Sequence, residues 1–136
     1  MNIELSGKEY RRLLDMVYIG NWILNSTRGN DRFEDYDVLM EKLFSRCPEQ
    51  GMTALVEYWQ GHIVPSEAYE NGGIHEAIAD YEDAVFFSIL AEELARRDLG
   101  LEASDPDDFT ELTDRMDEYL NEFDKNGLST VNVENV

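Results

Sequence analysis

The side chains best suited to chemistry in this sequence are its two histidines, His62 and His75, and the acidic residues near them. His75 is followed by glutamate, as at the start of a zinc-protease helix, but position 79 holds alanine where the second histidine ligand belongs. A metal ion between both histidines, Glu67 and Glu70 is conceivable because they bracket one connection, yet the Glu-x-x-His pairs of di-iron bundles are missing. We therefore expect solvated or locally hydrogen-bonded histidines, no metal site and no cofactor.

The segment from Asp124 to Gly127 resembles the opening of a calcium-binding EF-hand loop. Its later positions do not fit, because Leu128 occupies a ligand position, Ser129 replaces the glycine of the sharp turn and Asn135 replaces the bidentate glutamate. A helix that ends at Gly127 in a left-handed conformation explains the same residues better.

The components of nucleophilic catalysis are also missing. The sequence contains no glycine-flanked serine elbow, no glycine-rich phosphate loop and no Cys-His pair suggested by context. Cys47 lies on the apolar stripe of a predicted helix, which indicates a small buried hydrophobic residue. Carboxylates are so numerous that spacing alone cannot nominate a general acid and base, so no catalytic residue is predicted.

Charge is the most informative property of the chain. It contains 30 acidic and 11 basic residues, for a formal net charge of −19. The imbalance grows along the sequence: residues 1–65 hold 10 acids and 7 bases, residues 66–101 hold 9 and 2, and residues 102–136 hold 11 and 2. Such a surface repels phosphate backbones and anionic lipids and attracts basic proteins and cations. We therefore expect neither a nucleic acid nor a membrane as a direct partner.

The last predicted helix bears a row of carboxylates opposite its apolar face. Spaced by three and four residues, this acidic row consists of Asp107, Glu111, Asp114, Glu118 and Glu122. One interpretation is a solvated face that keeps the protein soluble, suited to a salty cytoplasm because only 3 lysines accompany the 30 acids. The other is a docking strip for a basic protein or peptide, such as a DNA-binding protein, a nuclease or a toxin.

A second candidate surface is the connection from Gly51 to Gly73, which is too long to be a plain turn. It carries the aromatic and imidazole side chains of Tyr58, Trp59, His62 and Tyr69. These side chains either cover the core or line a groove for a ligand or peptide. Within the connection we expect two helical turns over Met52–Trp59 and a short helix capped by Ser66.

The remaining composition indicates one soluble domain spanning residues 1–136. A hydrophobic content of 43% suffices for a core despite the charge. One cysteine requires no oxidising compartment, the N-terminus lacks the pattern of a signal peptide, and the apolar runs are shorter than a bilayer span. We expect a cytoplasmic protein.

Helix signals are clear along the chain, and the first is the strongest. Ser6 and Glu9 form a capping box that starts a helix at Gly7. This helix is apolar on nearly every side over residues 13–24, which is typical of a central helix wrapped by others. Gly20 in its interior costs about 1 kcal/mol relative to alanine and predicts that another element packs closely there.

Three further helices follow. The second begins after Asp31 and ends at Pro48, the third runs from about Ile74 to Leu99, and the fourth starts at Asp105 and Pro106. The predicted buried stripe of the third helix is Ile74, Ile78, Tyr81, Val85 and Ile89. The predicted buried face of the fourth is Phe109, Leu112, Met116, Tyr119, Leu120 and Phe123.

Apolar and polar residues alternate at both ends of the chain, around Ile3 and around Val133, which favours a short strand at each terminus. The predicted fold is an all-α, compact bundle of four main helices with short, pairable strands at the N- and C-termini. An exposed strand edge there would permit a homodimer. The function that fits best is non-catalytic binding of a basic protein or peptide. The alternative is a metal-assisted or small-molecule enzyme that uses the connection over residues 51–73.

Overall fold

The computed structural model describes residues 1–100 and 109–135, and within them the chain is mostly helical, as predicted. The four longer helices of these residues are α1 (Gly7–Asn25), α2 (Glu34–Phe44), α4 (His75–Leu99) and α5 (Phe109–Asn126). The shorter elements are η1 (Pro48–Gln50), η2 (Thr53–Leu55), β1 (Val56–Trp59), β2 (His62–Pro65), α3 (Glu67–Tyr69) and η3 (Glu70–Ile74). Within the described ranges, no helix combines the length and hydropathy that crossing a membrane requires.

The chain divides into two compact units. Unit 1 comprises Met1–Ile78 and unit 2 comprises Ala79–Val136. The boundary falls inside α4, so this helix contributes its first residues to unit 1 and the remainder to unit 2. The single domain expected over residues 1–136 stays a prediction.

The start of α1 confirms the predicted capping box. The Ser6 hydroxyl accepts a hydrogen bond from the Glu9 N–H at 3.2 Å, and the Glu9 carboxylate accepts one from the Ser6 N–H at 2.7 Å. These bonds satisfy two of the N–H groups that a helix start leaves without partners.

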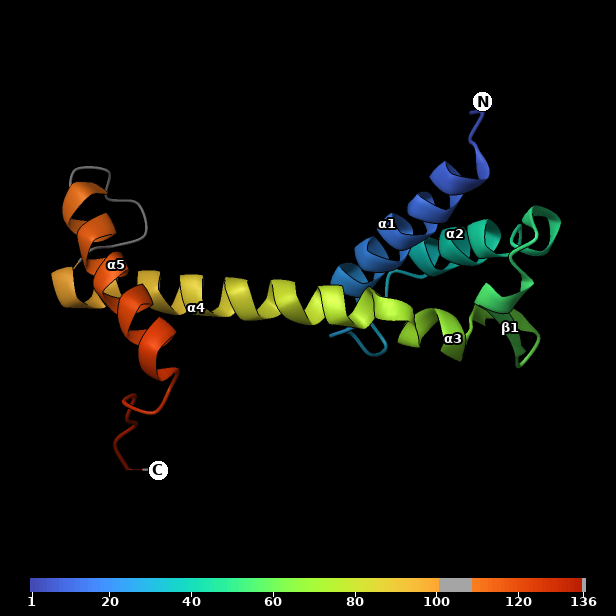
Figure 1. The fold of residues 1–136 in the computed structure, drawn as a ribbon. Coiled ribbons are helices and arrows are strands. Elements are labelled where there is room, and N and C mark those ends of the chain that lie inside the picture. The colour runs from blue at the N-terminus through green and yellow to red at the C-terminus, as the bar shows by residue number, and fades with distance from the viewer. Residues whose placement is uncertain (101–108, 136) are drawn as a thin grey trace. The chain divides into compact units, whose positions relative to one another are not determined.

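The core of unit 1 forms between α1, α2 and the connection that follows them, with α1 and α2 side by side (Figure 1). Its fully buried side chains include Leu14, Phe44, Cys47 and Tyr69. The rings of Phe44 and Tyr69 meet edge to face, with centroids 5.2 Å apart. The Tyr10 hydroxyl donates to the Leu43 carbonyl at 2.6 Å and lies 3.4 Å from the Cys47 Sγ. The prediction that Cys47 is a buried small residue is confirmed.

The outer face of α1 corrects the expectation of a fully enclosed helix. Met16 and Ile23 are 70% and 63% exposed, on the side opposite the buried Leu14 and Tyr18. A Cβ atom added at Gly20 would meet no atom within 4 Å, so no element of the described chain packs closely against this glycine. The apolar residues of α1 therefore outnumber those that its neighbours cover.

The two strands of the described chain form a hairpin in the middle of the sequence. β1 and β2 pair antiparallel, with Trp59 opposite His62 next to the turn. The turn residues Gln60 and Gly61 have φ values of 49° and 81°. Positive φ at both positions is the requirement of a type I′ turn, whose twist matches that of paired strands.

This hairpin corrects two predictions. The strands expected at the termini are not formed: residues 1–6 and 131–135 are irregular, and Ile3 and Val133 are 73% and 65% exposed. Without a core against which to bury one face, an alternating segment gains little from extension. The two helical turns expected over Met52–Trp59 are replaced by the short η2 and by β1. The helix expected at Ser66 is confirmed, since its hydroxyl caps α3 by accepting from the Tyr69 N–H.

Unit 2 consists of the second part of α4 with α5 lying across it (Figure 1). The rings of Phe87 and Phe123 pack at 5.5 Å between centroids. Phe87 is half-buried, whereas Phe123, Ala91, Ala95 and Leu112 are buried. Asp98 accepts hydrogen bonds from Arg115 at 2.7 Å and from the Tyr119 hydroxyl, which joins the two helices beyond the aromatic contact.

Helix ends in this part of the chain follow the prediction, but burial does so only in part. Gly100 and Gly127 have φ values of 65° and 56° and end α4 and α5 as expected. The expected buried stripes are wrong at Tyr81, Ile89 and Phe109, which are 61%, 55% and 77% exposed. A pair of helices buries only the residues at its crossing, so longer apolar stripes stay partly in solvent. The predicted start at Asp105 and Pro106 lies outside the described residues.

Candidate functional sites

The acidic row of α5 is accessible over most of its length. Glu111, Asp114 and Glu118 are exposed, and Glu118 is paired with Arg115 one turn away on the same helix. Glu122 accepts hydrogen bonds from the Asn126 side chain and from the Thr130 hydroxyl, both at 2.8 Å. The hydrogen bond from Thr130 is the main cause of a lowered pKa of Glu122, followed by the hydrogen bond from Asn126. Asp107 lies outside the described residues.

A groove between α4 and α5 in unit 2 was not anticipated from the sequence. Its volume is about 560 Å³. The apolar side chains that line it are Ala84, Phe87, Leu120 and Phe123. Asp80, Asp83 and Asp124 line the same groove together with Asn121. Among the residues that the structure describes, no lysine or arginine pairs with these three aspartates. We refer to this hollow as the α4–α5 groove.

The four ring residues predicted in the connection are not brought together. Tyr69 is 1% exposed and belongs to the core of unit 1, so it cannot line a surface groove. Tyr58 and Trp59 are exposed at the end of β1, where their side chains point to opposite faces of the hairpin. Trp59 and His62 share one face and line a groove of about 550 Å³ between α2 and the hairpin.

His62 in this hairpin groove is engaged with α2. Its Nδ1 lies 3.1 Å from the Oε2 of Glu41, and the Glu41 Oε1 accepts a hydrogen bond from the Ile63 N–H at 3.0 Å. The hydrogen bond from the Ile63 N–H is the main cause of a lowered pKa of Glu41, followed by the hydrogen bond from His62. Ile63 and Pro65 are the residues of β2 whose backbone nitrogens face away from β1. Glu41 accepts from the Ile63 N–H, and Pro65 has no N–H, so this edge of the hairpin is closed to further strands.

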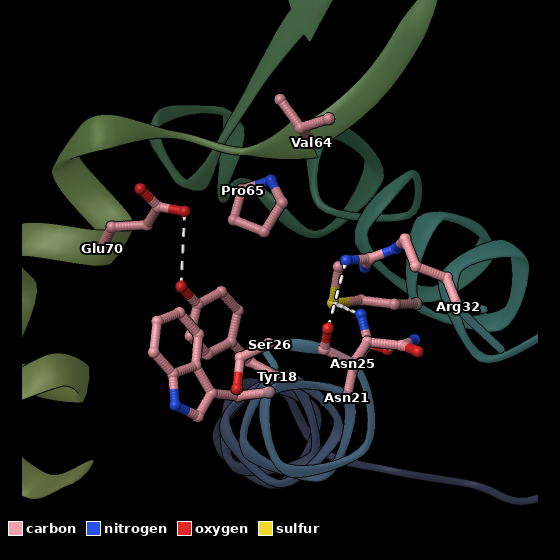
Figure 2. A pocket seen from close by; sticks show the side chains of 10 residues that line it. Tyr18, Asn21, Asn25, Ser26, Arg32, Val64, Pro65 and Glu70 are labelled. Atoms are coloured by element: carbon pink, nitrogen blue, oxygen red, sulfur yellow. Dashed lines mark hydrogen bonds between the residues drawn. The ribbon is translucent and has the colours of Figure 1, made fainter. Parts of the chain in front are cut away.

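A third hollow, which we call the Tyr18 pocket, opens between α1, α2, β2 and η3 in unit 1 (Figure 2). Its volume is about 340 Å³. The apolar and aromatic side chains that line it are Tyr18, Trp22, Met40, Val64 and Pro65. Its polar lining residues are Asn21, Asn25, Ser26, Arg32 and Glu70. In Figure 2, Glu70 and Arg32 approach the pocket from opposite sides.

One side of the Tyr18 pocket is a hydrogen-bonded chain through the Tyr18 hydroxyl. This hydroxyl donates to the Glu70 Oε1 at 3.3 Å and lies 2.7 Å from the His75 Nε2. Burial, followed by the neighbouring Glu70 carboxylate, raises the pKa of Tyr18 to about 12. The His75 ring also meets the Trp22 ring edge to face at 4.8 Å.

The other side of the pocket is a closed polar network. The Asn25 amide donates to the Asn21 Oδ1 at 2.7 Å, and the Asn21 amide donates to the Asp37 Oδ1 at 3.0 Å. Arg32 binds Asp37 through two hydrogen bonds of 2.8 and 3.0 Å. The hydrogen bond from Arg32 is the main cause of a lowered pKa of Asp37. The sequence contains one signal for this network, which is a pair of asparagines, Asn21 and Asn25, spaced by four residues within an apolar helix.

The described residues contain no group of three or more His, Cys, Asp or Glu side chains placed to hold a metal ion. His62 and His75 are engaged at different sites, with Glu41 and with Tyr18 respectively. Comparisons of the chain with protein-family models, curated proteins and solved structures find no match.

Proposed function

We propose that this protein is a non-catalytic, cytoplasmic interaction protein that binds a basic protein or peptide through unit 2. The observation that carries the proposal is the α4–α5 groove, which is lined both by apolar side chains and by Asp80, Asp83 and Asp124. The aspartates and the apolar side chains line one hollow, so a single partner segment could contact both.

The groove suits a partner that is both cationic and apolar. Lysine and arginine have aliphatic stems that cover apolar surface while their charged ends stay near water or a carboxylate. Such side chains could contact Phe87 and Phe123 with their stems and end at the aspartates. Because no basic residue of the described chain neutralises these aspartates, a partner's cations would meet unsatisfied negative charge.

The acidic row on α5 contributes in a different way. Glu111 and Asp114 are exposed, and no basic residue of the described chain forms an ion pair with them. They therefore attract cations over roughly a Debye length of 8–10 Å. Attraction of this kind accelerates encounter and weakens as salt is added. We propose that the acidic row speeds the encounter with the partner, whereas the α4–α5 groove forms the contact with it.

The proposal is tested with an amphipathic helical peptide of lysine and leucine as the probe, and its glutamate and leucine counterpart as the control ligand. Binding is measured by fluorescence anisotropy at low and high ionic strength, about 0.05 and 0.5 M. The triple substitution Asp80→Asn, Asp83→Asn and Asp124→Asn should weaken binding of the basic peptide at least tenfold.

A matched variant removes the same charge from unit 1. Its substitutions are Glu4→Gln, Glu57→Gln and Glu67→Gln, all at exposed positions. Binding should change less than threefold in this variant. Equal losses in the two triple variants would mean that net charge alone attracts the peptide, and the interpretation of the acidity as a solubility device would then stand.

A further inference from the structure

The Tyr18 pocket carries a net negative charge at one side. Among the described residues, no lysine or arginine pairs with Glu70, whose carboxylate accepts only the Tyr18 hydroxyl at 3.3 Å. The positive charge on the opposite side is compensated, because Arg32 is held by both carboxylate oxygens of Asp37. Glu70 is therefore the uncompensated charge of the pocket.

The surroundings of Glu70 suit a cation better than an anion or a metal. The two side-chain amides that line the pocket are committed elsewhere: the Asn25 amide donates to Asn21 and to the Phe33 carbonyl, and the Asn21 amide donates to Asp37. A metal ion would need further carboxylate or imidazole ligands, and no group of three such side chains is assembled in the described chain.

The aromatic side chains add a second attraction for a cation. Tyr18 and Trp22 lie nearly parallel, with centroids 6.4 Å apart and planes 19° apart, and both line the pocket. Aromatic faces attract ammonium groups within about 6 Å of the ring, most strongly where water is partly excluded. Met40, Val64 and Pro65 complete an apolar wall for an alkyl chain.

We propose that the Tyr18 pocket binds a small alkylammonium ion, with its N–H groups donating to the Glu70 carboxylate and its carbon chain against Trp22 and Pro65. The volume of about 340 Å³ lies at the lower end of the range for small-molecule sites and leaves room for an amine with a short carbon chain. This site is in unit 1 and does not depend on the peptide-binding function proposed for unit 2.

The test uses n-butylammonium chloride as the probe and n-butanol as a neutral ligand of nearly the same shape. Replacement of Trp59 by phenylalanine leaves Trp22 as the remaining tryptophan, so its fluorescence reports the pocket directly. Butylammonium should change this fluorescence in a saturable manner and bind at least tenfold more tightly than butanol. Equal affinity of the two ligands, or no saturable fluorescence change with butylammonium, would overturn the proposal, whatever effect substitutions in the pocket have.

Two charge-matched variants assign the contact. Glu70→Gln keeps an oxygen that can accept the Tyr18 hydroxyl but removes the negative charge, and should weaken butylammonium binding at least tenfold while leaving butanol binding within twofold. Glu67→Gln removes the same charge from an exposed position outside the pocket lining and should leave both affinities within twofold. Similar losses in both variants would assign the binding to general charge attraction and contradict the proposed contact. Unchanged far-ultraviolet circular dichroism verifies the fold of each variant.

Discussion

The side-chain amide of Asn25 binds both backbone polar groups of Phe33. Its Oδ1 accepts from the Phe33 N–H at 2.8 Å, and its Nδ2 donates to the Phe33 carbonyl at 3.2 Å. Asn25 is 1% exposed at the end of α1, and Phe33 immediately precedes α2. One buried side chain thus fixes the return of the chain between the two helices that frame the Tyr18 pocket.

Replacement of Asn25 by alanine should destabilise unit 1 by about 1–3 kcal/mol, because the Phe33 N–H and the Oδ1 of the buried Asn21 would each lose a hydrogen-bond partner. Urea denaturation followed by Trp22 fluorescence, in a protein with Trp59→Phe, measures this change. Asn30→Ala, at an exposed position of the same loop, is the control and should change the free energy of unfolding by less than about 0.5 kcal/mol. Equal effects of the two substitutions would contradict the role of the Asn25 amide.

Substitution of two glycines by alanine should have opposite effects. Gly20→Ala should stabilise the protein by about 1 kcal/mol, because the site lies inside a helix and its added methyl group meets no atom within 4 Å. Gly61→Ala should destabilise the hairpin, because Gly61 has a φ of 81°, which side chains other than that of glycine rarely adopt. Thermal unfolding compares the two variants, and a loss of stability in Gly20→Ala would indicate an unrecognised neighbour at α1.

The stability of unit 2 should depend on pH through Asp98. Its pKa is held far below the usual range, first by the hydrogen bond from Tyr119 and then by those from Arg97 and Arg115. Because the folded-state pKa is depressed, the contribution of Asp98 is fully present above its ordinary pKa of about 3.9 and is lost as the pH falls below that value.

The comparison that isolates this contribution is Asp98→Asn against the unmodified protein, measured as the free energy of urea unfolding from about pH 7 to pH 2. The variant should be the less stable protein at neutral pH, and the difference should shrink as the pH falls below about 4. A difference that stays constant over this range would exclude the ionised carboxylate as its source. The same substitution at Asp117, which is exposed on α5 and outside this network, is the control.

Local signals in the sequence predicted local structure well. The Ser6 capping box, the cap at Ser66 and the left-handed glycines at the ends of α4 and α5 each depend on a few neighbouring residues, so short patterns suffice. The hairpin was missed because its turn is Gln60-Gly61, a weaker signal than Asn-Gly, and because the aromatic residues before it fit a helix equally well.

Burial and sites were harder to predict, because both depend on residues that are distant in sequence. The apolar pattern of α1 does not reveal that Met16 remains exposed, since this depends on how many elements are available to cover the helix. Asp80, Asp83 and Asp124 look like ordinary solvated residues until α4 and α5 bring them to one groove. The Tyr18 pocket had one sequence signal, the pair of Asn21 and Asn25 on an apolar helix, since buried amides require partners.

The environment of Cys47 makes its thiol a reporter of local opening. It is the chain's one cysteine, it is fully buried, and it lies against the Tyr10 hydroxyl that ties α1 to the last turn of α2. An alkylating or disulfide reagent can reach the sulfur only when these elements separate, so the labelling rate measures how often unit 1 opens. Occupancy of the Tyr18 pocket should slow this labelling, whereas a peptide held by unit 2 should affect it only if opening of the two units is linked.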